Sequence, residues 1–195
     1  MRAPILPLAA AVFVAGCASD APRVNEYLDP QTAVTIRSLA EPLVYAHDAP
    51  ELAANTRDYL SLGLVETNNM GRRKHYLALI SWSTIDRHRV GIVAAPVPER
   101  VELDLGGKPL ELAGASHEPR GFGIGGRLFR PPAGYSGESW YEVTPAQLRA
   151  LAAAPPASIA LDGDAGRISY LPWRAEARGL EEFVRDIPDA ASGTR

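Results

Sequence analysis

Cysteine is nearly absent from this sequence, since Cys17 is the only one among 195 residues. A single cysteine excludes an internal disulfide, so the fold must be stabilised by its core and its hydrogen bonds. Long hydrophobic runs are also missing. The apolar stretch from Ile5 to Val14 has ten residues, about half of the roughly 20 that a membrane-spanning helix needs. This stretch is therefore too short to form a stable transmembrane segment.

An excess of positive charge is lacking as well. Lysine occurs only as Lys74 and Lys108, and the 20 basic residues are outnumbered by 23 acidic ones, for a formal net charge of −3. This balance provides neither the basic surface of a nucleic-acid-binding protein nor a polybasic patch for membranes. We therefore expect no nucleic-acid partner.

The N-terminus has the organisation of an export signal. Arg2 provides a positive start, Ile5 to Val14 the apolar core, and Val14-Ala15-Gly16-Cys17 the end of the segment. The last four residues resemble the lipobox of bacterial lipoproteins, where signal peptidase II cleaves before the cysteine and its thiol receives diacylglycerol. An ordinary secretory peptide that happens to contain a cysteine is the alternative. The lipobox is favoured because the sole thiol stands where the motif requires it.

The resemblance implies a bacterial lipoprotein whose signal peptide is residues 1–16 and whose membrane anchor is a palmitate-bearing Cys17. Two or three acyl chains on one residue hold a protein firmly, whereas a single chain binds only marginally. By the enterobacterial sorting rule, Ala18 favours the outer membrane, with the domain facing the periplasm. The rest of the chain resembles, in general character, the small envelope lipoproteins of Gram-negative bacteria.

The chain divides into few segments beyond the signal. Residues 17–30 show no periodicity and contain Pro22 and Pro30, which predicts a flexible tether reaching up to roughly 40 Å. Residues 31–188 are expected to form a single β-rich domain, and residues 189–195 a frayed C-terminus.

Strand patterns dominate from residue 32 onward. Tyr59–Thr67 and His75–Ile85 flank the turn-prone residues 68–71, which predicts a long hairpin. Gly106-Gly107 joins two further alternating runs and predicts a second hairpin. Other strands are expected at 32–37, 43–46, 90–94, 140–143, 158–161 and 167–171.

Two helices interrupt the strands. Thr144 and Gln147 form a capping box that predicts a helix at about 145–153. An amphipathic pattern predicts another at about 176–187, with apolar residues spaced i, i+3, i+4 and i+7: Leu180, Phe183, Val184 and Ile187. The expected fold class is mainly β, an antiparallel β-sandwich or open barrel with two short helices.

Two motifs imitate catalytic or cofactor signatures. Residues 121–126 match GxGxxG literally, but no helix can open in the Arg- and Pro-containing stretch that follows. We interpret this segment as a flexible glycine-rich strand or bulge. Residues 134–137, Gly-Tyr-Ser-Gly, fall one residue short of a nucleophile elbow. We therefore assign no cofactor and no catalytic residue.

Metal-ligand spacing is also missing among the four histidines, His47, His75, His88 and His117. No metal ligand is assigned, although a site built from dispersed residues such as His75, His88 and His117 stays open. The three tryptophans, Trp82, Trp140 and Trp173, lie in strand-like segments and are expected in the core.

One basic cluster stands out, Arg72-Arg73-Lys74-His75, next to the expected tip of the long hairpin. It is a possible interaction surface for anionic envelope components or an acidic partner, or an ordinary solvated turn. The leading hypothesis is a non-catalytic, membrane-anchored domain that binds a protein or envelope component. The alternative is a small periplasmic enzyme or ligand-binding protein with a site from dispersed residues.

Overall fold

The computed structural model describes residues 22–50, 54–85, 100–114, 116–130, 135–163, 166–175 and 178–188. The signal peptide, Cys17, the strand expected at 90–94, His88 and the C-terminal residues 189–195 lie outside the described residues. No helix within the described part of the chain is long and apolar enough to cross a membrane.

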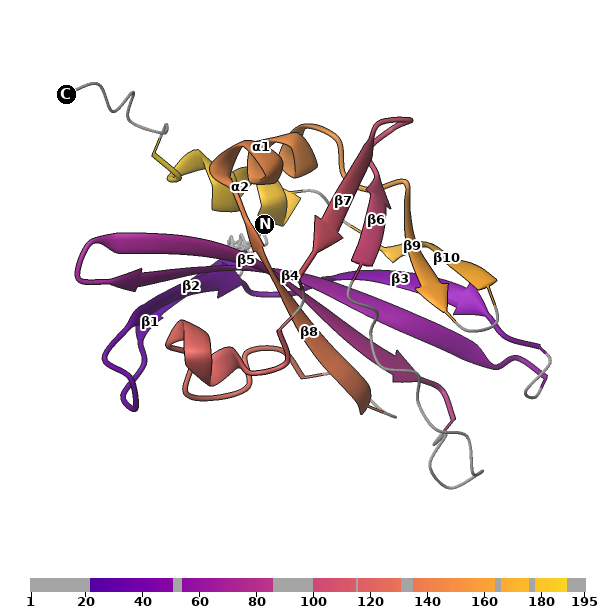
Figure 1. Ribbon diagram of the computed structural model, residues 1–195, viewed down its shortest axis with the longest axis horizontal. Coiled ribbons are helices and arrows are strands. Elements are labelled where there is room, and N and C mark those ends of the chain that lie inside the picture. The colour runs from indigo at the N-terminus through magenta and orange to yellow at the C-terminus, as the bar shows by residue number, and fades with distance from the viewer. Residues whose placement is uncertain are drawn as a thin grey trace, which may run out of the picture.

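A long antiparallel hairpin forms the centre of the molecule (Figure 1). Its arms are β4 (Arg57–Asn69) and β5 (Arg72–Ser83). Met70 and Gly71 turn the chain with φ angles of 51° and 88°, and the Asn68 side chain accepts a hydrogen bond from the Gly71 amide at 2.8 Å. Residues 76–80 are buried without alternation, as in a central strand that is covered on both faces.

The other strands extend this hairpin on both sides. They are β1 (Val24–Leu28), β2 (Thr35–Leu39), β3 (Leu43–Asp48), β6 (Arg100–Asp104), β7 (Pro109–Ala113), β8 (Tyr135–Val143), β9 (Ser158–Gly163) and β10 (Gly166–Arg174). All ladders are antiparallel and belong to one sheet of ten strands. The order runs β1-β2-β4-β3-β10-β9-β6-β7, with β5 and β8 following β4 on its other edge.

The sheet curls but stays open. A single bridge joins Ser116, just after β7, to Trp140 in β8, while no ladder between β7 and β8 is present in the described residues. The mainly antiparallel β class with two short helices is therefore confirmed, in the form of one open sheet.

Both expected helices are present. The first, α1 (Pro145–Ala153), begins at the predicted capping box, in which Thr144 and Gln147 each accept a hydrogen bond from the other's backbone amide. The second, α2 (Arg178–Arg185), is shorter than expected but buries Leu180 and Phe183 as the pattern predicts. A short 3₁₀ turn, η1 (Pro119–Phe122), adds a third helical element.

Two layers cover the opposite faces of the hairpin. Figure 1 shows α1 and α2 packed together on one side and the segment around η1 on the other. On the η1 side, the Phe122 ring contacts Tyr76, with ring centroids 4.4 Å apart. The Phe129 ring lies over Gly63, where a Cβ atom would overlap it. A glycine in the middle of β4 therefore lets this segment pack closely on the sheet.

Three expectations need correction. The tether expected to reach residue 30 contains β1, which pairs with β2 from Val24 to Leu28. Among the tryptophans only Trp140 belongs to the core, at 1% exposure, whereas Trp173 is 48% exposed and Trp82 is half-buried. The glycine-rich segment 121–126 is neither strand nor bulge but the end of η1 and the loop after it.

Candidate functional site

A row of charged side chains crosses four strands on the helix-covered face of the sheet. The strand register places Glu26 beside Arg37, Arg37 beside Glu66, and Glu66 beside His75. Because directly opposite residues in an antiparallel ladder share a face, the alternating charges become neighbours. Arg37, Glu66 and His75 are all buried, with exposures of 8%, 5% and 6%.

Glu66 is the centre of this row. Its carboxylate lies 2.9 Å from His75 Nε2 and 3.5 Å from an Arg73 guanidinium nitrogen. Burial disfavours the ionised carboxylate, but the hydrogen bond to His75 and the charges of Arg73, His75 and Arg37 outweigh it, so the pKa of Glu66 is lowered. Glu66 is therefore held as a buried anion among cations.

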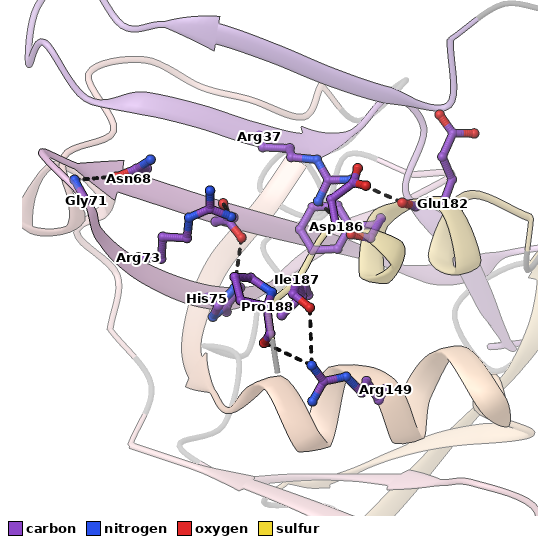
Figure 2. Close-up of polar contacts among 12 residues, drawn as sticks. Arg37, Asn68, Gly71, Arg73, His75, Arg149, Glu182, Asp186, Ile187 and Pro188 are labelled. Carbon is purple, nitrogen blue, oxygen red and sulfur yellow. Dashed lines mark hydrogen bonds and ion pairs between the residues drawn. The ribbon is translucent and has the colours of Figure 1, made fainter. Parts of the chain in front are cut away.

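Arg37 connects this row to α2, as Figure 2 shows. Its guanidinium donates to the backbone oxygens of Phe183 at 2.6 Å and Glu182 at 3.1 Å, and to the Asp186 carboxylate at 2.8 Å. It also lies over the Phe183 ring, 4.9 Å from the centroid. The carbonyls at a helix C-terminus lack partners within the helix, so Arg37 satisfies two of them and fixes α2 on the sheet.

A recess of about 230 Å³ opens beside this row. Its lining is polar and carries both signs of charge: Glu26, Thr35, Arg37, Glu66, Asn68, Arg73 and Asp186. The cations and anions here pair mainly with one another. The arrangement stabilises the contact between sheet and helix and offers little charge for a ligand.

The expected basic cluster is divided by the pleat of β5. Arg73 and His75 both contact the Glu66 carboxylate, at 3.5 Å and 2.9 Å, and His75 is buried. Lys74 belongs to the opposite face, where it pairs with Glu142 at 3.1 Å. Arg72 is exposed beside the hairpin turn. An interaction surface made of Arg72, Arg73, Lys74 and His75 stays a prediction, but these four side chains do not share one face.

The histidines proposed for a dispersed site have separate partners. His75 contacts Glu66. His117 Nδ1 lies 3.0 Å from the Glu138 backbone oxygen and 3.2 Å from Ser139 Oγ. Ser139 is fully buried, so a substrate has no access to its hydroxyl. In the described part of the chain, no group of three or more metal-ligating side chains is close enough to hold an ion.

The glycine-rich segment has a structural explanation. The Asp29 carboxylate accepts hydrogen bonds from the amides of Gly125 at 2.7 Å and Gln31 at 2.8 Å, and these amides lower its pKa. Gly123 has a φ of 85°, and Gly125 is so close to Asp29 that a Cβ would lie 2.8 Å from the carboxylate. The glycines thus serve close packing against residues 29–34.

An aromatic cleft lies on the opposite face of the sheet from α2. Tyr59 and Trp82 are directly opposite each other in the β4–β5 ladder, and their rings stack with centroids 4.0 Å apart and planes 9° apart. The Trp82 indole N–H donates to Ser61 Oγ at 3.0 Å. This bond and the stack hold Trp82 in one orientation.

Trp173 in β10 completes the aromatic group. Its ring meets Tyr59 edge-on, at 6.1 Å and 74°, and the Arg57 guanidinium lies over it at 4.5 Å. Arg57 is itself held by Asp48, at 2.6 Å. Trp173 therefore has a defined position although 48% of its surface is exposed.

The cleft has a volume of about 980 Å³. Ionisable, apolar and aromatic side chains share its lining: Glu41, Pro42, Leu43, Val44, Tyr59, Ser61, Trp82, Arg130, Trp173, Arg174 and Ala175. A wide cleft with aromatic surface and a few polar groups is the usual form of a binding site. It is the better candidate of the two recesses.

Comparison with protein-family models, with curated proteins and with solved structures finds no match to this chain.

This cleft was not predicted from the sequence, although the pairing of Tyr59 with Trp82 could have been. The predicted hairpin turn at 68–71 sets the register, and that register places Tyr59 opposite Trp82. No predicted turn or register places Trp173 beside these two residues. It joins the group only because β10 pairs with β3 through an irregular register between Pro172 and Arg174, which a strand pattern does not reveal.

Proposed function

We propose that this protein is a membrane-anchored envelope lipoprotein whose β-rich domain binds an envelope component or protein without catalysing a reaction. We further propose that the aromatic cleft is its binding site. The observation that carries the proposal is Trp173, which is exposed yet held in place by Arg57 and Tyr59.

A rigid, exposed tryptophan is a favourable group for recognition. Water contacts its apolar surface in the unbound protein, so covering that surface releases free energy. Little side-chain entropy is lost on binding because neighbouring contacts already hold the ring. Tryptophan, tyrosine and arginine are also the residues that most often dominate binding energy at interfaces, and all three types line or border this cleft.

The ionisable groups beside the charged recess at Arg37 and Glu66 support the proposal that the domain is not catalytic. Glu66 and His75 are hydrogen-bonded to each other, and Arg37 is hydrogen-bonded to the backbone of α2. A general acid or base must reach a substrate atom directly or through one water, whereas these side chains are buried in a contact that holds the fold together.

The site can be tested by crosslinking in intact cells that express the full chain. A photo-reactive amino acid placed at Glu41, an exposed cleft position, should give a defined product that mass spectrometry identifies. Two exposed control positions lie elsewhere: Met70 at the tip of the β4–β5 hairpin and Lys108 in the β6–β7 turn.

The three positions separate the competing interpretations. A product from Glu41 alone supports the cleft as the binding site. A product from Met70 alone would instead favour the neighbouring basic cluster at Arg72–His75 and would overturn the proposed site. The proposed site would also be overturned if no position gave a product above the level seen without irradiation.

A further inference from the structure

The shape of the aromatic cleft restricts what can bind in it. Tyr59 and Trp82 contact each other face to face at 4.0 Å, so no slot remains between them for an inserted side chain. Grooves that hold proline-rich peptides receive their ligand between aromatic ridges. A stacked pair with Trp173 at its edge instead offers flat ring surface. The C–H face of a sugar ring is a ligand surface that can stack on such a platform.

The charges around the cleft restrict the ligand further. Among the described residues, Arg130 and Arg174 line it together with one carboxylate, that of Glu41. Arg57 lies over one face of the Trp173 ring, and its positive charge repels a cationic ligand that approaches the exposed part of the ring. A positive ligand is therefore disfavoured. Guanidinium groups present planar pairs of donors that match carboxylates, so a ligand with carboxylate groups is favoured.

The size of the cleft points to more than one sugar unit. Its volume of about 980 Å³ is at the upper end of the roughly 300–1,000 Å³ that ligand sites usually have. Charged and apolar residues are mixed along its wall: Glu41 stands beside Pro42, Leu43 and Val44 at the start of β3, and Arg174 stands between Trp173 and Ala175 at the end of β10. Such a wall suits a ligand with hydroxyls on its edge and C–H groups on its face.

We propose that the cleft binds an acidic glycan, with a sugar ring stacked on Trp173 and a carboxylate held by Arg174 or Arg130. This inference rests on the proposed function of the cleft and specifies its ligand class. The bond to the carboxylate provides selectivity for acidic over neutral glycans, and the stacking provides the part of the affinity that does not depend on charge.

The test is calorimetric titration of the purified full chain in detergent micelles with matched probes. Hexagalacturonate supplies sugar rings with carboxylates, and its methyl ester supplies the same rings without charge. An octaproline peptide represents the competing ligand class. We expect hexagalacturonate to bind at least about tenfold more tightly than its methyl ester, and octaproline not to bind.

Variants of the chain test whether hexagalacturonate binds in the aromatic cleft. Trp173→Ala should weaken hexagalacturonate at least about tenfold, while Trp173→Phe should retain part of the affinity because the flat ring remains. Arg174→Gln should reduce the preference for the acid over the ester. Tyr27→Ala removes an aromatic ring that is 41% exposed on β1, away from the cleft, and should change nothing. Thermal unfolding of each variant shows that the fold is retained.

Each other outcome overturns the inference. Equal affinity for acid and ester removes the acidic requirement, octaproline binding lost in Trp173→Ala shows a peptide ligand, and glycan binding unchanged in Trp173→Ala places the ligand elsewhere. If neither glycan binds while Glu41 still crosslinks in cells, the glycan inference fails and the proposed binding site stands. If crosslinking fails as well, both fall.

Discussion

A buried carboxylate among cations makes the stability of this fold depend on acidity. The pKa of Glu66 is lowered in the folded protein, so the folded state holds its charged form more strongly than the unfolded state does. The stability that Glu66 contributes is therefore complete above its ordinary pKa of 4.5 and is lost as the pH falls through the lower, folded value.

Glu66→Gln tests this dependence. At pH 7 the variant should be less stable by about 3 kcal/mol, because it removes the buried anion that His75 and Arg73 contact. On acidification below about pH 4.5 the difference from wild type should shrink, since protonation removes the same charge from the wild-type protein. Urea unfolding across the pH range measures both.

The matched control is Glu142→Gln, which removes an exposed carboxylate paired with Lys74. Exposed ion pairs contribute about 0–1 kcal/mol, so this variant should follow the wild-type profile. A constant difference between Glu66→Gln and wild type at every pH would contradict the assignment.

Gly63 is a second residue on which packing depends. Gly63→Ala places a methyl group against the Phe129 ring, and overpacking of this kind typically costs about 1–3 kcal/mol. Denaturant unfolding measures the loss. Gly126→Ala, where a Cβ has open space, is the control and should change stability by less than about 0.5 kcal/mol. Equal losses in the two variants would mean that Phe129 does not lie on Gly63.

At the scale of elements, local signals explain what could be predicted. In the capping box, the side chains of Thr144 and Gln147 accept hydrogen bonds from each other's backbone amides. The effect is therefore local, and α1 begins where the motif places it. The turn at Met70-Gly71 acts in the same way on the central hairpin. By contrast, β1 carries mostly exposed side chains and is held by backbone pairing at the sheet edge, so no hydrophobic pattern reveals it.

The position of α2 depends on a contact that the amphipathic pattern does not show. Arg37 donates to the backbone oxygens of Phe183 and Glu182, across more than a hundred residues of sequence. In Arg37→Ala, α2 should open locally more often, with its opening free energy reduced by about 2–3 kcal/mol. Hydrogen exchange of residues 178–188 measures this.

Arg185→Ala is the control within the same helix, because Arg185 is exposed at its last turn. Exchange of α2 should stay near the wild-type rate there. If Arg37→Ala left exchange of α2 unchanged while lowering global stability, Arg37 would act on the sheet and not as the docking residue for α2.

At the scale of the whole molecule, β1 changes the expected reach of the domain. Only residues 18–23 separate Cys17 from the start of β1 at Val24. Fully extended, six residues span about 20 Å, half of the reach expected from a tether to residue 30. If Cys17 is lipidated as proposed, the start of β1 lies within about 20 Å of the bilayer surface.

Membrane attachment itself is the last prediction. Cys17→Ser should abolish labelling of the full chain by radioactive palmitate and move the protein out of the membrane fraction, because the hydroxyl does not replace the thiol that receives diacylglycerol. Ala18→Ser, which alters the neighbouring residue and keeps the thiol, should label normally. Labelling that persists in Cys17→Ser would show that residues 14–17 are not a lipobox. Labelling that disappears while the protein stays in the membrane fraction would show a second attachment, and the aromatic cleft would then be the first surface to test, by repeating the fractionation with Trp173→Ala.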